Sequence, residues 1–383
     1  MREAYLLDAV RTPFGKRDGV LKEIHPVDLL GGLLQGLLRR TRMDPSKVDD
    51  VIMGCVDQVG EQGANIARNA WLSAGLPESV PATTVDRQCG SALQAVQFAA
   101  QGVMAGQYDL VIAGGVESMS RVPIMSTLGR GLGTPKTDGI RERYHLERAW
   151  FDQAYGADRI AKQWGLTRED LDRYAFDSHR RASAARAKGY FQPEILPVQT
   201  HVHVGEDEGI RDNPSLEKMA QLPPAFDHVD LITAGNASQI SDGASALLIG
   251  SKEAVEAFGF RPLARFVAFA VVGADPVTML TGPIPATRKV LQRAGLRLED
   301  IDLFEINEAF ASVVLAWQKE MGVSLEKVNV NGGAIAVGHP LGATGGRLVG
   351  TLAYELRRRN GRYGLIAICE GGGMANAAII EAL

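Results

Sequence analysis

Hydrophobic and polar positions follow two alternating patterns along the first 118 residues. Short continuous apolar runs predict strands, and longer runs with apolar side chains at helical spacing predict amphipathic helices. The predicted strands are residues 4–10, 48–56, 82–86 and 108–118, and the predicted helices are residues 27–43, 63–75 and 90–106. Strands that alternate with helices are typical of an α/β layered structure.

The pattern changes between residues 119 and 239. Prolines, irregular polar stretches and charged helical runs such as REDLDRYAFDSHRRASAARAKG (168–189) replace the buried strands. We expect this segment to be a loop domain that lies over the core and is not part of the sheet.

From residue 262 the first pattern returns as an internal repeat. Both copies have the same order of helix, turn and strand, and the matching pairs are 29–56 with 284–310, 90–118 with 342–372, and 241–254 with 371–383. The sequence therefore predicts two copies of one α/β unit with an insertion in the first. The predicted parts are an N-terminal half (1–118, completed by 240–261), the loop domain (119–239) and a C-terminal half (262–383).

Composition narrows the class of protein. The chain has 383 residues, 45% hydrophobic and 22% charged, which suits a globular protein of two or more domains. A net charge of −4 gives no reason to expect nucleic acid or an anionic membrane as a partner. No apolar run approaches the ~20 residues of a membrane span, and the N-terminus lacks a signal-peptide pattern. The sparse set of three cysteines argues against a disulfide framework and for the cytoplasm.

Three reactive side chains lie on glycine-bordered turns. His339 lies between Gly338 and Pro340 in NVNGGAIAVGHPLGATGG (329–346). Cys89 comes directly before Gly90, and Cys369 begins the glycine-rich run CEGGG (369–373). A lone histidine in such a loop is more often satisfied by a backbone carbonyl than reactive. Two cysteines in similar settings shift the interpretation towards thiol chemistry.

Cys89 follows the strand at 82–86 and precedes a helix that opens at Gly90. A helix N-terminus favours an anion, so we expect the thiolate to be stabilised there. The alternative is a buried structural cysteine, which suits Cys55 well, so Cys55 is given no role. If the duplicated halves pack with equivalent turns face to face, His339 would take the Cys89 proton.

Two further groups end predicted strands. Cys369 precedes Gly371, whose backbone amide is a candidate donor to a developing oxyanion. Asn307, in EINEAF, either orients a water or caps the following helix, and both roles remain open.

Competing motifs fail on specific residues. GGAIAVGHP has the outline of a phosphate loop, but His339 and Pro340 replace the required Lys and Ser/Thr. There is no dinucleotide-binding fingerprint between an early strand and helix, and no CxxC. The Cys and His spacing is too wide for a small zinc site, so no metal is expected.

Four motifs in order resemble those of a thiolase. They are Cys89 in DRQCGSALQ, NEAF (307–310), GGAIAVGHPLGATG (332–345) and CEGGG (369–373), and the resemblance runs end to end through RTPFGK, AGGVESMS and TAGNASQISDGAS. It implies an α/β fold in which two similar five-stranded halves form a five-layer α/β/α/β/α core. It also implies a loop domain that binds coenzyme A, and a homodimer or homotetramer.

The resemblance also implies roles. Cys89 would accept the acyl group of a CoA thioester, His339 would activate it, and a water held by Asn307 would help His339 to stabilise the oxyanion. Cys369 would move the proton of the α-carbon or of the CoA thiol, and the amides of Cys89 and Gly371 would form a second oxyanion hole. Coenzyme A is then a substrate, and no tightly bound cofactor is implied.

In the loop domain, Arg211 and Phe226 fall at positions of the family's R…MA-L-PAF pattern. They would contact the CoA nucleotide and pantetheine, and Ser238 in AGNAS would bond the pantetheine amide. An arginine in a polar loop is otherwise usually only solvated.

Two stretches depart from the family pattern. FDQAYGAD (151–158) replaces the YHMG run of acetoacetyl-specific members, which favours a longer or bulkier 3-ketoacyl group. Glu370 stands after Cys369 where many relatives carry a small residue, and its carboxylate either perturbs the thiol or points to solvent; the sequence does not distinguish the two.

The sequence therefore predicts a cytoplasmic thiolase that exchanges acyl groups between CoA thioesters through an acyl-cysteine, in either direction. One alternative is a decarboxylating ketoacyl synthase of the same fold, and Cys369 speaks against it. A second is a non-catalytic acyl-CoA or lipid carrier, which would have lost a catalytic residue. A third alternative, a nicotinamide-dependent dehydrogenase, is disfavoured because the dinucleotide-binding motif is missing from the sequence.

Overall fold

The computed structural model describes residues 2–128, 131, 133–146 and 150–383, so positions 129–130, 132 and 147–149 of the predicted loop domain lie outside the described part. The strands are β1 (Tyr5–Arg11), β2 (Gly15–Lys16), β3 (Asp50–Gly54), β4 (Ala82–Val85), β5 (Leu110–Ser118), β6 (Val198–Gln199), β7 (His203–Val204), β8 (Ser241–Gly250), β9 (Ala264–Gly273), β10 (Leu303–Ile306), β11 (Tyr363–Glu370) and β12 (Met374–Ala382). The α-helices are α1 (Pro26–Thr41), α2 (Ile66–Ser73), α3 (Ser91–Ala105), α4 (Asp138–Arg143), α5 (Gln153–Gln163), α6 (Arg168–Ala187), α7 (Leu216–Ala220), α8 (Lys252–Phe258), α9 (Pro283–Ala294), α10 (Ala311–Met321), α11 (Ala334–Val337) and α12 (Thr344–Arg359). The strands and helices predicted for the first 118 residues are confirmed within a few residues.

The two halves of the chain join edge to edge in one sheet, in the order β10-β11-β12-β9-β1-β8-β5-β3-β4. The join is the short antiparallel pairing of β1 with β9, through Tyr5 with Arg265 and Leu6 with Ala264. On either side the pairings repeat: β3 with β5 and β10 with β11 are parallel, and β5 with β8 and β11 with β12 are antiparallel. The internal repeat in the sequence thus appears as a repeat of strand topology.

The second half differs from the expected five strands at its outer edge. In the second half, the strand that would correspond to β4 is missing among the described residues beyond β10. Only a single bridge between Phe304 and Val328 stands in its place. The next residue, Asn329, has a left-handed φ of 47°, which ends the extended backbone. Its side-chain amide then bonds the N–H of Ile306 at 2.9 Å and the carbonyl of Ile306 at 2.8 Å, in place of a strand's backbone.

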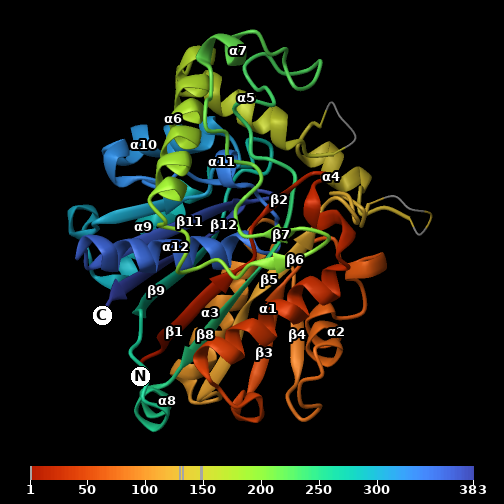
Figure 1. The fold of residues 1–383 in the computed structure, drawn as a ribbon. Coiled ribbons are helices and arrows are strands. Elements are labelled where there is room, and N and C mark those ends of the chain that lie inside the picture. Colours follow the sequence, from red (N-terminus) through yellow and green to blue (C-terminus); the bar gives the residue numbers. More distant parts are fainter. Residues whose placement is uncertain (1, 129–130, 132, 147–149) are drawn as a thin grey trace.

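Helices cover the sheet in layers (Figure 1). Helices α1 and α2 pack on the outer face of the first half, and α9 and α10 pack on the second half. Helices α3 and α12 contact each other and strands of both halves, so they form the middle layer. Strands β5 and β8 are buried at every residue, which explains the apolar runs LVIAGGV in β5 and ALLIG in β8. The two halves of the sheet therefore form two strand layers, with α3 and α12 between them and the other helices outside. The predicted α/β fold with five layers is confirmed.

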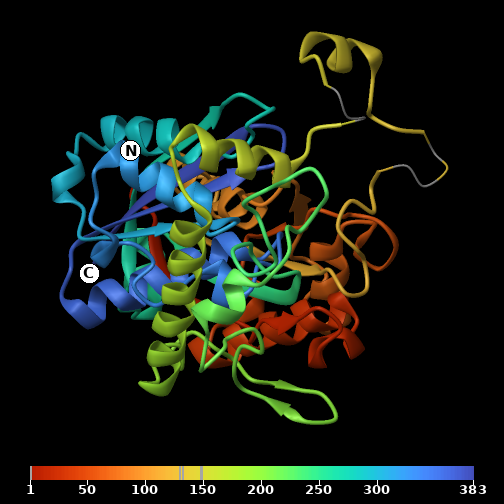
Figure 2. The ribbon, with the colours of Figure 1, turned by 90° about the horizontal axis from the view of Figure 1, so that it is seen from above.

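The segment between β5 and β8 adds no described strand to the main sheet. It contains α4 to α7 and the small β6–β7 pair, and Figure 2 shows the part with α4 reaching away from the layered core. The domain boundaries drawn from the sequence stay a prediction.

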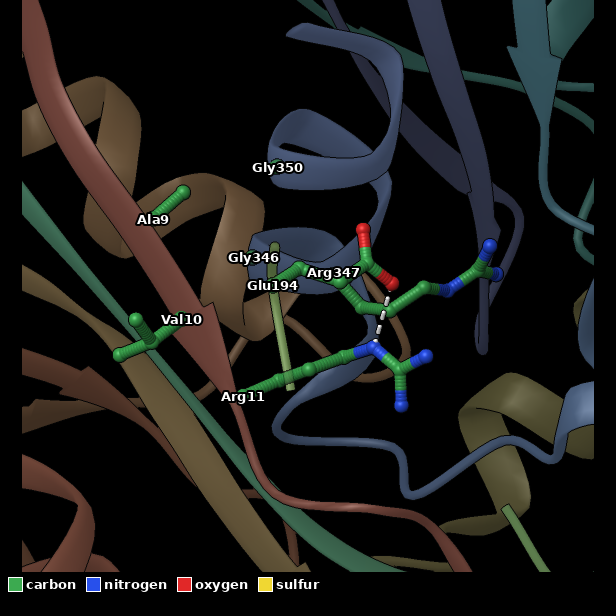
Figure 3. Close-up of a pocket in the computed structure, with 7 residues that line it drawn as sticks. All are labelled: Ala9, Val10, Arg11, Glu194, Gly346, Arg347 and Gly350. Carbon is green, nitrogen blue, oxygen red and sulfur yellow. Dashed lines mark hydrogen bonds and ion pairs between the residues drawn. The ribbon is translucent and has the colours of Figure 1, made fainter. Parts of the chain in front are cut away.

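A buried arginine ties β1 to this inserted segment. Arg11 Nε donates to Glu194 Oε1 at 2.7 Å (Figure 3), and its two terminal nitrogens donate to the Asp207 carboxylate at 2.6 and 2.9 Å. All three side chains are almost fully buried. Bidentate pairing of this kind offsets the desolvation of the charges, but only while every partner is present.

We expect Arg11→Met to lower the free energy of unfolding by about 3–5 kcal/mol, because it leaves two buried carboxylates without their cation. The measurement is the urea unfolding midpoint by circular dichroism. Arg297→Met, which removes an exposed pair with Asp300, is the control and should leave the midpoint almost unchanged. Equal midpoints for the two variants would contradict the assignment.

Candidate active site

Cys89 lies on a tight turn between β4 and α3. Gln88, just before it, has a left-handed φ of 49°, and Gly90 is the N-cap of α3, as the sequence predicted. The Ser91 hydroxyl accepts from the Arg87 amide at 2.8 Å and donates to the Gln88 carbonyl at 2.6 Å. This side chain holds the turn in a conformation that is sparsely populated outside glycine, and such strain is common at reactive sites.

The glycine-rich end of β11 meets the Cys89 turn. A Cβ on Gly371 would lie 2.9 Å from Gln88 Oε1, so the two turns are in close contact. The N–H groups of Cys89 and Gly371 are near enough to the Cys89 sulfur to lower its pKa. The structure thus brings together the two amides that the sequence proposed as oxyanion donors.

The expected stabilisation of a Cys89 thiolate is wrong for the free protein. Burial, with Glu370 next in effect, raises the pKa of Cys89 to about 12, and the two amides only partly oppose this. Cys369 is also fully buried, and burial together with the neighbouring Cys89 raises its pKa well above the ordinary value. Both sulfurs are therefore thiols in the resting site. Cys55, also buried, lies in the apolar layer under α1.

His339 lies in the connection between α11 and α12, in a buried polar setting. Its Nδ1 is 2.7 Å from the Thr344 hydroxyl, whose single proton is donated to the Pro340 carbonyl at 2.8 Å. Thr344 must therefore accept from His339, which puts the imidazole proton on Nδ1. The bare Nε2 then accepts from Asn307 Nδ2 at 3.3 Å. Burial, and then Arg347, lower the pKa of His339 to about 3, so the ring is a neutral base.

Asn307 follows β10 and bonds backbone to backbone with Ala367 at 3.0 Å, two residues before Cys369. It does not cap the next helix, because the N-cap of α10 is Phe310. Its Oδ1 is buried and has no partner among the described residues. Of the two roles left open by the sequence, only orientation of a neighbouring group fits this geometry.

The turns of the two repeats face each other, as expected from the duplication. A Cβ on Gly345, in the first turn of α12, would lie 2.2 Å from the Leu93 amide in the first turn of α3. The N-terminal ends of the two middle helices, which follow His339 and Cys89, are therefore in close contact.

Two carboxylates that sequence reasoning did not identify hold the His339 loop. Glu117, at the end of β5, is fully buried and accepts from the Gly342 amide at 2.9 Å, and also from Val56, Asp57 and Gln62. The only signal in the sequence is an acidic residue that ends an apolar strand.

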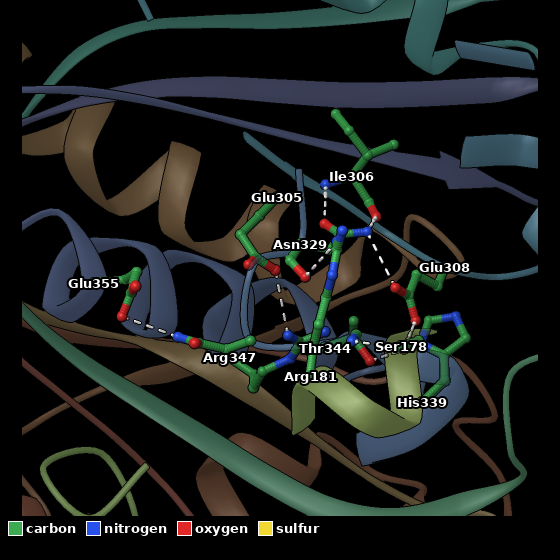
Figure 4. A network of polar contacts seen from close by, with 12 residues as sticks. Ser178, Arg181, Glu305, Ile306, Glu308, Asn329, His339, Thr344, Arg347 and Glu355 are labelled. Atoms are coloured by element: carbon green, nitrogen blue, oxygen red, sulfur yellow. Dashed lines mark hydrogen bonds and ion pairs between the residues drawn. The ribbon is translucent and has the colours of Figure 1, made fainter. Parts of the chain in front are cut away.

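Glu308 holds the other end of the same loop (Figure 4). It accepts from the Ile335 amide at 3.1 Å, the Ser178 hydroxyl at 2.7 Å and the Tyr174 hydroxyl at 2.9 Å. Ser178 and Tyr174 belong to α6, so Glu308 links the inserted segment to the loop. Its place in NEAF was noted, but its role was not.

An open pocket of about 250 Å³ lies between the inserted segment and this loop. Arg211, Lys218 and His179 line its polar side, and Met219 and Ile335 are among its apolar lining residues. The lining residues do not include Phe226, which is 55% exposed and stacks on His228 at 5.5 Å, or Ser238, whose amide donates to Ala309 at 2.9 Å. The structure therefore brings Arg211 alone of the three predicted CoA contacts to this pocket.

Within the described ranges, no group of three or more His, Cys, Asp and Glu side chains is arranged to hold a metal ion. Among the helices that the structure describes, none combines the length and apolar character needed to cross a membrane.

The tautomer of His339 can be tested directly. We expect its imidazole to stay neutral with the proton on Nδ1 from pH 5 to pH 8, because burial and Arg347 disfavour the cation. The measurement is ¹⁵N NMR, with the resonance assigned by its loss in His339→Asn. Thr344→Val removes the acceptor for Nδ1–H and should change the tautomer ratio, whereas a charged ring at pH 7 would contradict the assignment.

Comparisons with known proteins agree along the whole chain. Residues 4–253 match the thiolase N-terminal domain and residues 260–382 match the thiolase C-terminal domain. The chain is 53% identical to the steroid 3-ketoacyl-CoA thiolase FadA6 of Mycobacterium tuberculosis, over 100% of this chain and 95% of that protein. It is 42% identical to a 3-ketoacyl-CoA thiolase of Bacillus subtilis, over the full length of both.

Solved structures give the same result. The acetyl-CoA acetyltransferase of Bacillus anthracis superposes with a TM-score of 0.90 at 40% identity, covering 100% of this chain and 99% of that one. Human mitochondrial 3-ketoacyl-CoA thiolase also gives 0.90, at 38% identity and the same coverage. The protein is therefore a member of the thiolase family, an acyltransferase that moves acyl groups between CoA thioesters.

Proposed function

We propose that Cys89 carries the acyl group. In the cleavage direction His339 Nε2 removes the Cys89 proton as the sulfur attacks the 3-keto carbonyl of a 3-ketoacyl-CoA. The bond between C2 and C3 then breaks, and the acyl group stays on sulfur while acetyl-CoA leaves as its enolate. Three observations support this proposal: the Gly371 amide lies beside the Cys89 sulfur, Asn307 bonds His339, and the first turns of the helices that follow Cys89 and His339 are in contact.

The electrostatics support attack that is coupled to proton transfer. The pKa of Cys89, about 12, and that of His339, about 3, leave the proton on sulfur in the resting site. The thiolate therefore develops only as the new C–S bond forms and spreads its charge. The N–H groups of Cys89 and Gly371 would then donate to the carbonyl oxygen that becomes an oxyanion, where one such donor contributes about 2.7–4 kcal/mol.

Cys369 is the second acid and base in this proposal. Its thiol protonates the enolate carbon of departing acetyl-CoA, and the thiolate so formed then takes the proton of the incoming CoA thiol. As acetyl-CoA leaves, His339, which then carries the Cys89 proton on Nε2, and a water held by Asn307 donate to the thioester oxygen of its enolate. The CoA thiolate then attacks the acyl-Cys89 carbonyl, whose oxyanion again accepts from the amides of Cys89 and Gly371. The acyl–sulfur bond breaks, the acyl group leaves as acyl-CoA, and Cys89 recovers its proton from His339. The burial of Cys369 beside Cys89 supports this role, as does the unpartnered Oδ1 of Asn307.

Coenzyme A would enter by the pocket lined by Arg211. Its cations, Arg211 and Lys218, suit phosphates, and its apolar side leads to Ile335 in the helix before His339. Phe226 and Ser238 would extend this contact towards the pantetheine. Their positions outside the pocket lining make these two assignments depend on the family pattern alone.

The acyl group is proposed to be longer or bulkier than acetoacetyl. The FDQAYGAD stretch opens α5, and there Asp152 Oδ2 lies 2.9 Å from Nε2 of His228, whose ring stacks on Phe226. The relative at 53% identity is named as a steroid 3-ketoacyl-CoA thiolase, which supports a large acyl group.

We also propose a homodimer or homotetramer in the cytoplasm. The open outer edge of β4 supports self-association, because its four residues are all partly or largely exposed. Three free thiols, two of them in the reacting site, support a reducing compartment.

The test is CoA-dependent cleavage of acetoacetyl-CoA and of 3-ketodecanoyl-CoA, followed by loss of the enolate absorbance. We expect a higher kcat/KM for the longer substrate, and loss of both activities by at least about 10⁴-fold in Cys89→Ala. Cys55→Ser, which keeps a donor to Glu117 Oε1, is the matched control and should retain activity. Cleavage that survives in Cys89→Ala would exclude Cys89 as the nucleophile, and a preference for acetoacetyl-CoA would exclude the enlarged acyl site.

A further inference from the structure

Glu370 is a buried carboxylate beside the two reactive thiols that the mechanism above does not use. It is the last residue of β11, between Cys369 and Gly371, and its exposed fraction is 0%. Neither side-chain oxygen has a hydrogen-bond partner among the described residues. A carboxyl group in such a place is costly as an anion, so its position calls for a function.

The carboxyl group points at the start of α3. Side chains alternate along β11, so Cys369 shares a face with Ala367, and Glu370 shares the opposite face with Ile368, towards the middle layer. A Cβ on Gly90 would lie only 2.1 Å from Glu370 Oε1. The carboxyl group therefore rests against the residue that follows Cys89.

Asn376 of β12 shares this contact. Its Nδ2 donates to the Gly90 carbonyl at 3.0 Å, while its Oδ1 has no hydrogen-bond partner among the residues that the structure describes and lies 2.9 Å from the same Cβ position on Gly90. Two acceptor oxygens that have no hydrogen-bond partner in the described part of the chain thus face the same side of Gly90. A proton on Glu370 would place a donor on this side, where Asn376 Oδ1 is the available acceptor.

The charges around the carboxyl group leave it largely uncompensated. The titratable and charged groups that face it or Cys89 are Asp86, Arg87, Cys89, Cys369 and Glu117. Arg87 makes no ion pair with Glu370, and within the described ranges its Nε has no hydrogen-bond partner. Burial therefore prevails over the attraction of Arg87 and raises the pKa of Glu370 to about 8.

We propose that Glu370 is a positioning residue that controls the reactivity of Cys89 through its own proton. As a neutral acid it bonds Asn376, supports the Gly90 turn and leaves the sulfur free to ionise. As a carboxylate it loses that bond and sets a negative charge beside the sulfur, which opposes the thiolate. The inference rests on Cys89 as the proposed nucleophile, but it concerns the thiol itself, so it can be tested without turnover.

The experiment compares Glu370→Gln with the wild type. Glutamine keeps the shape of the neutral acid and offers Asn376 an N–H donor, but it cannot ionise. The second-order rate of Cys89 alkylation by iodoacetamide is measured from pH 6 to pH 10, with the modified peptide quantified by mass spectrometry. We expect nearly equal rates below pH 7, and a ratio of variant to wild type that rises through pH 8 to about tenfold or more.

Glu305→Gln is the matched control. Glu305 is also buried with a pKa raised to about 8, but it faces Arg347 rather than Cys89. Its substitution should leave the alkylation profile of Cys89 unchanged. A ratio for Glu370→Gln that does not depend on pH would overturn the proposal, because a purely structural effect has no midpoint.

Stability gives a second readout that needs neither thiol nor substrate. The raised pKa means that the folded wild type binds a proton that the unfolded chain has lost, so its stability falls as pH rises between about 5 and 8. Glu370→Gln lacks this loss, and its melting temperature should gain on the wild type over that range. A constant difference would contradict the proposal. If Glu370→Gln does not fold, Glu370→Ala takes its place in both measurements.

The kinetic consequence separates this proposal from the assignment of the nucleophile. For thiolysis of acetoacetyl-CoA, the ratio of kcat/KM between Glu370→Gln and wild type should rise through the same midpoint near pH 8. The ratio of alkylation rates could rise with pH while the ratio of kcat/KM stays constant. That result would support the effect of Glu370 on Cys89 and would exclude Cys89 as the nucleophile.

Discussion

The site depends on two buried carboxylates that hold one glycine-rich loop from both sides. Glu117 of the first half accepts from the Gly342 amide, and Glu308 of the second half accepts from the Ile335 amide, on either side of His339. In a low-dielectric interior such charge-assisted bonds are strong, and a lost donor is costly. The loop that carries His339 is thereby fixed to both halves, and through Ser178 and Tyr174 to the inserted segment as well.

Burial then determines the chemistry. Removal of water raises the pKa of Cys89 and lowers that of His339, so the pair rests as a thiol and a neutral imidazole. The hydroxyl of Thr344 assigns the imidazole proton to Nδ1 and leaves Nε2 bare. A site of this kind does not store a reactive thiolate. Instead, the fixed N–H groups of Cys89 and Gly371 are in place to stabilise negative charge as it develops during the reaction.

Much of the fold could be predicted because its signals are local. Apolar periodicity defined the elements around Cys89, and the repeated order of helix, turn and strand predicted the facing turns that bring Gly345 against Leu93. What escaped prediction depends on contacts between distant residues. Glu117 and Gly342 are 225 positions apart, and the replacement of a fifth strand by the side chain of Asn329 depends on a fold already formed. The direction of the Cys89 pKa shift was wrong because the helix start is visible in sequence, whereas burial and the proximity of Glu370 are not.

The central claim is that Cys89, and not Cys369, carries the acyl group. The most direct test is acid quenching after the wild type is mixed with acetyl-CoA in the absence of free CoA, followed by peptide mass spectrometry. The account predicts one acetyl group on the peptide that contains Cys89, none on the peptide that contains Cys369, and release of the acetyl group when CoA is added. Acetylation at Cys369, or an acetyl group on Cys89 that added CoA does not remove, would contradict it.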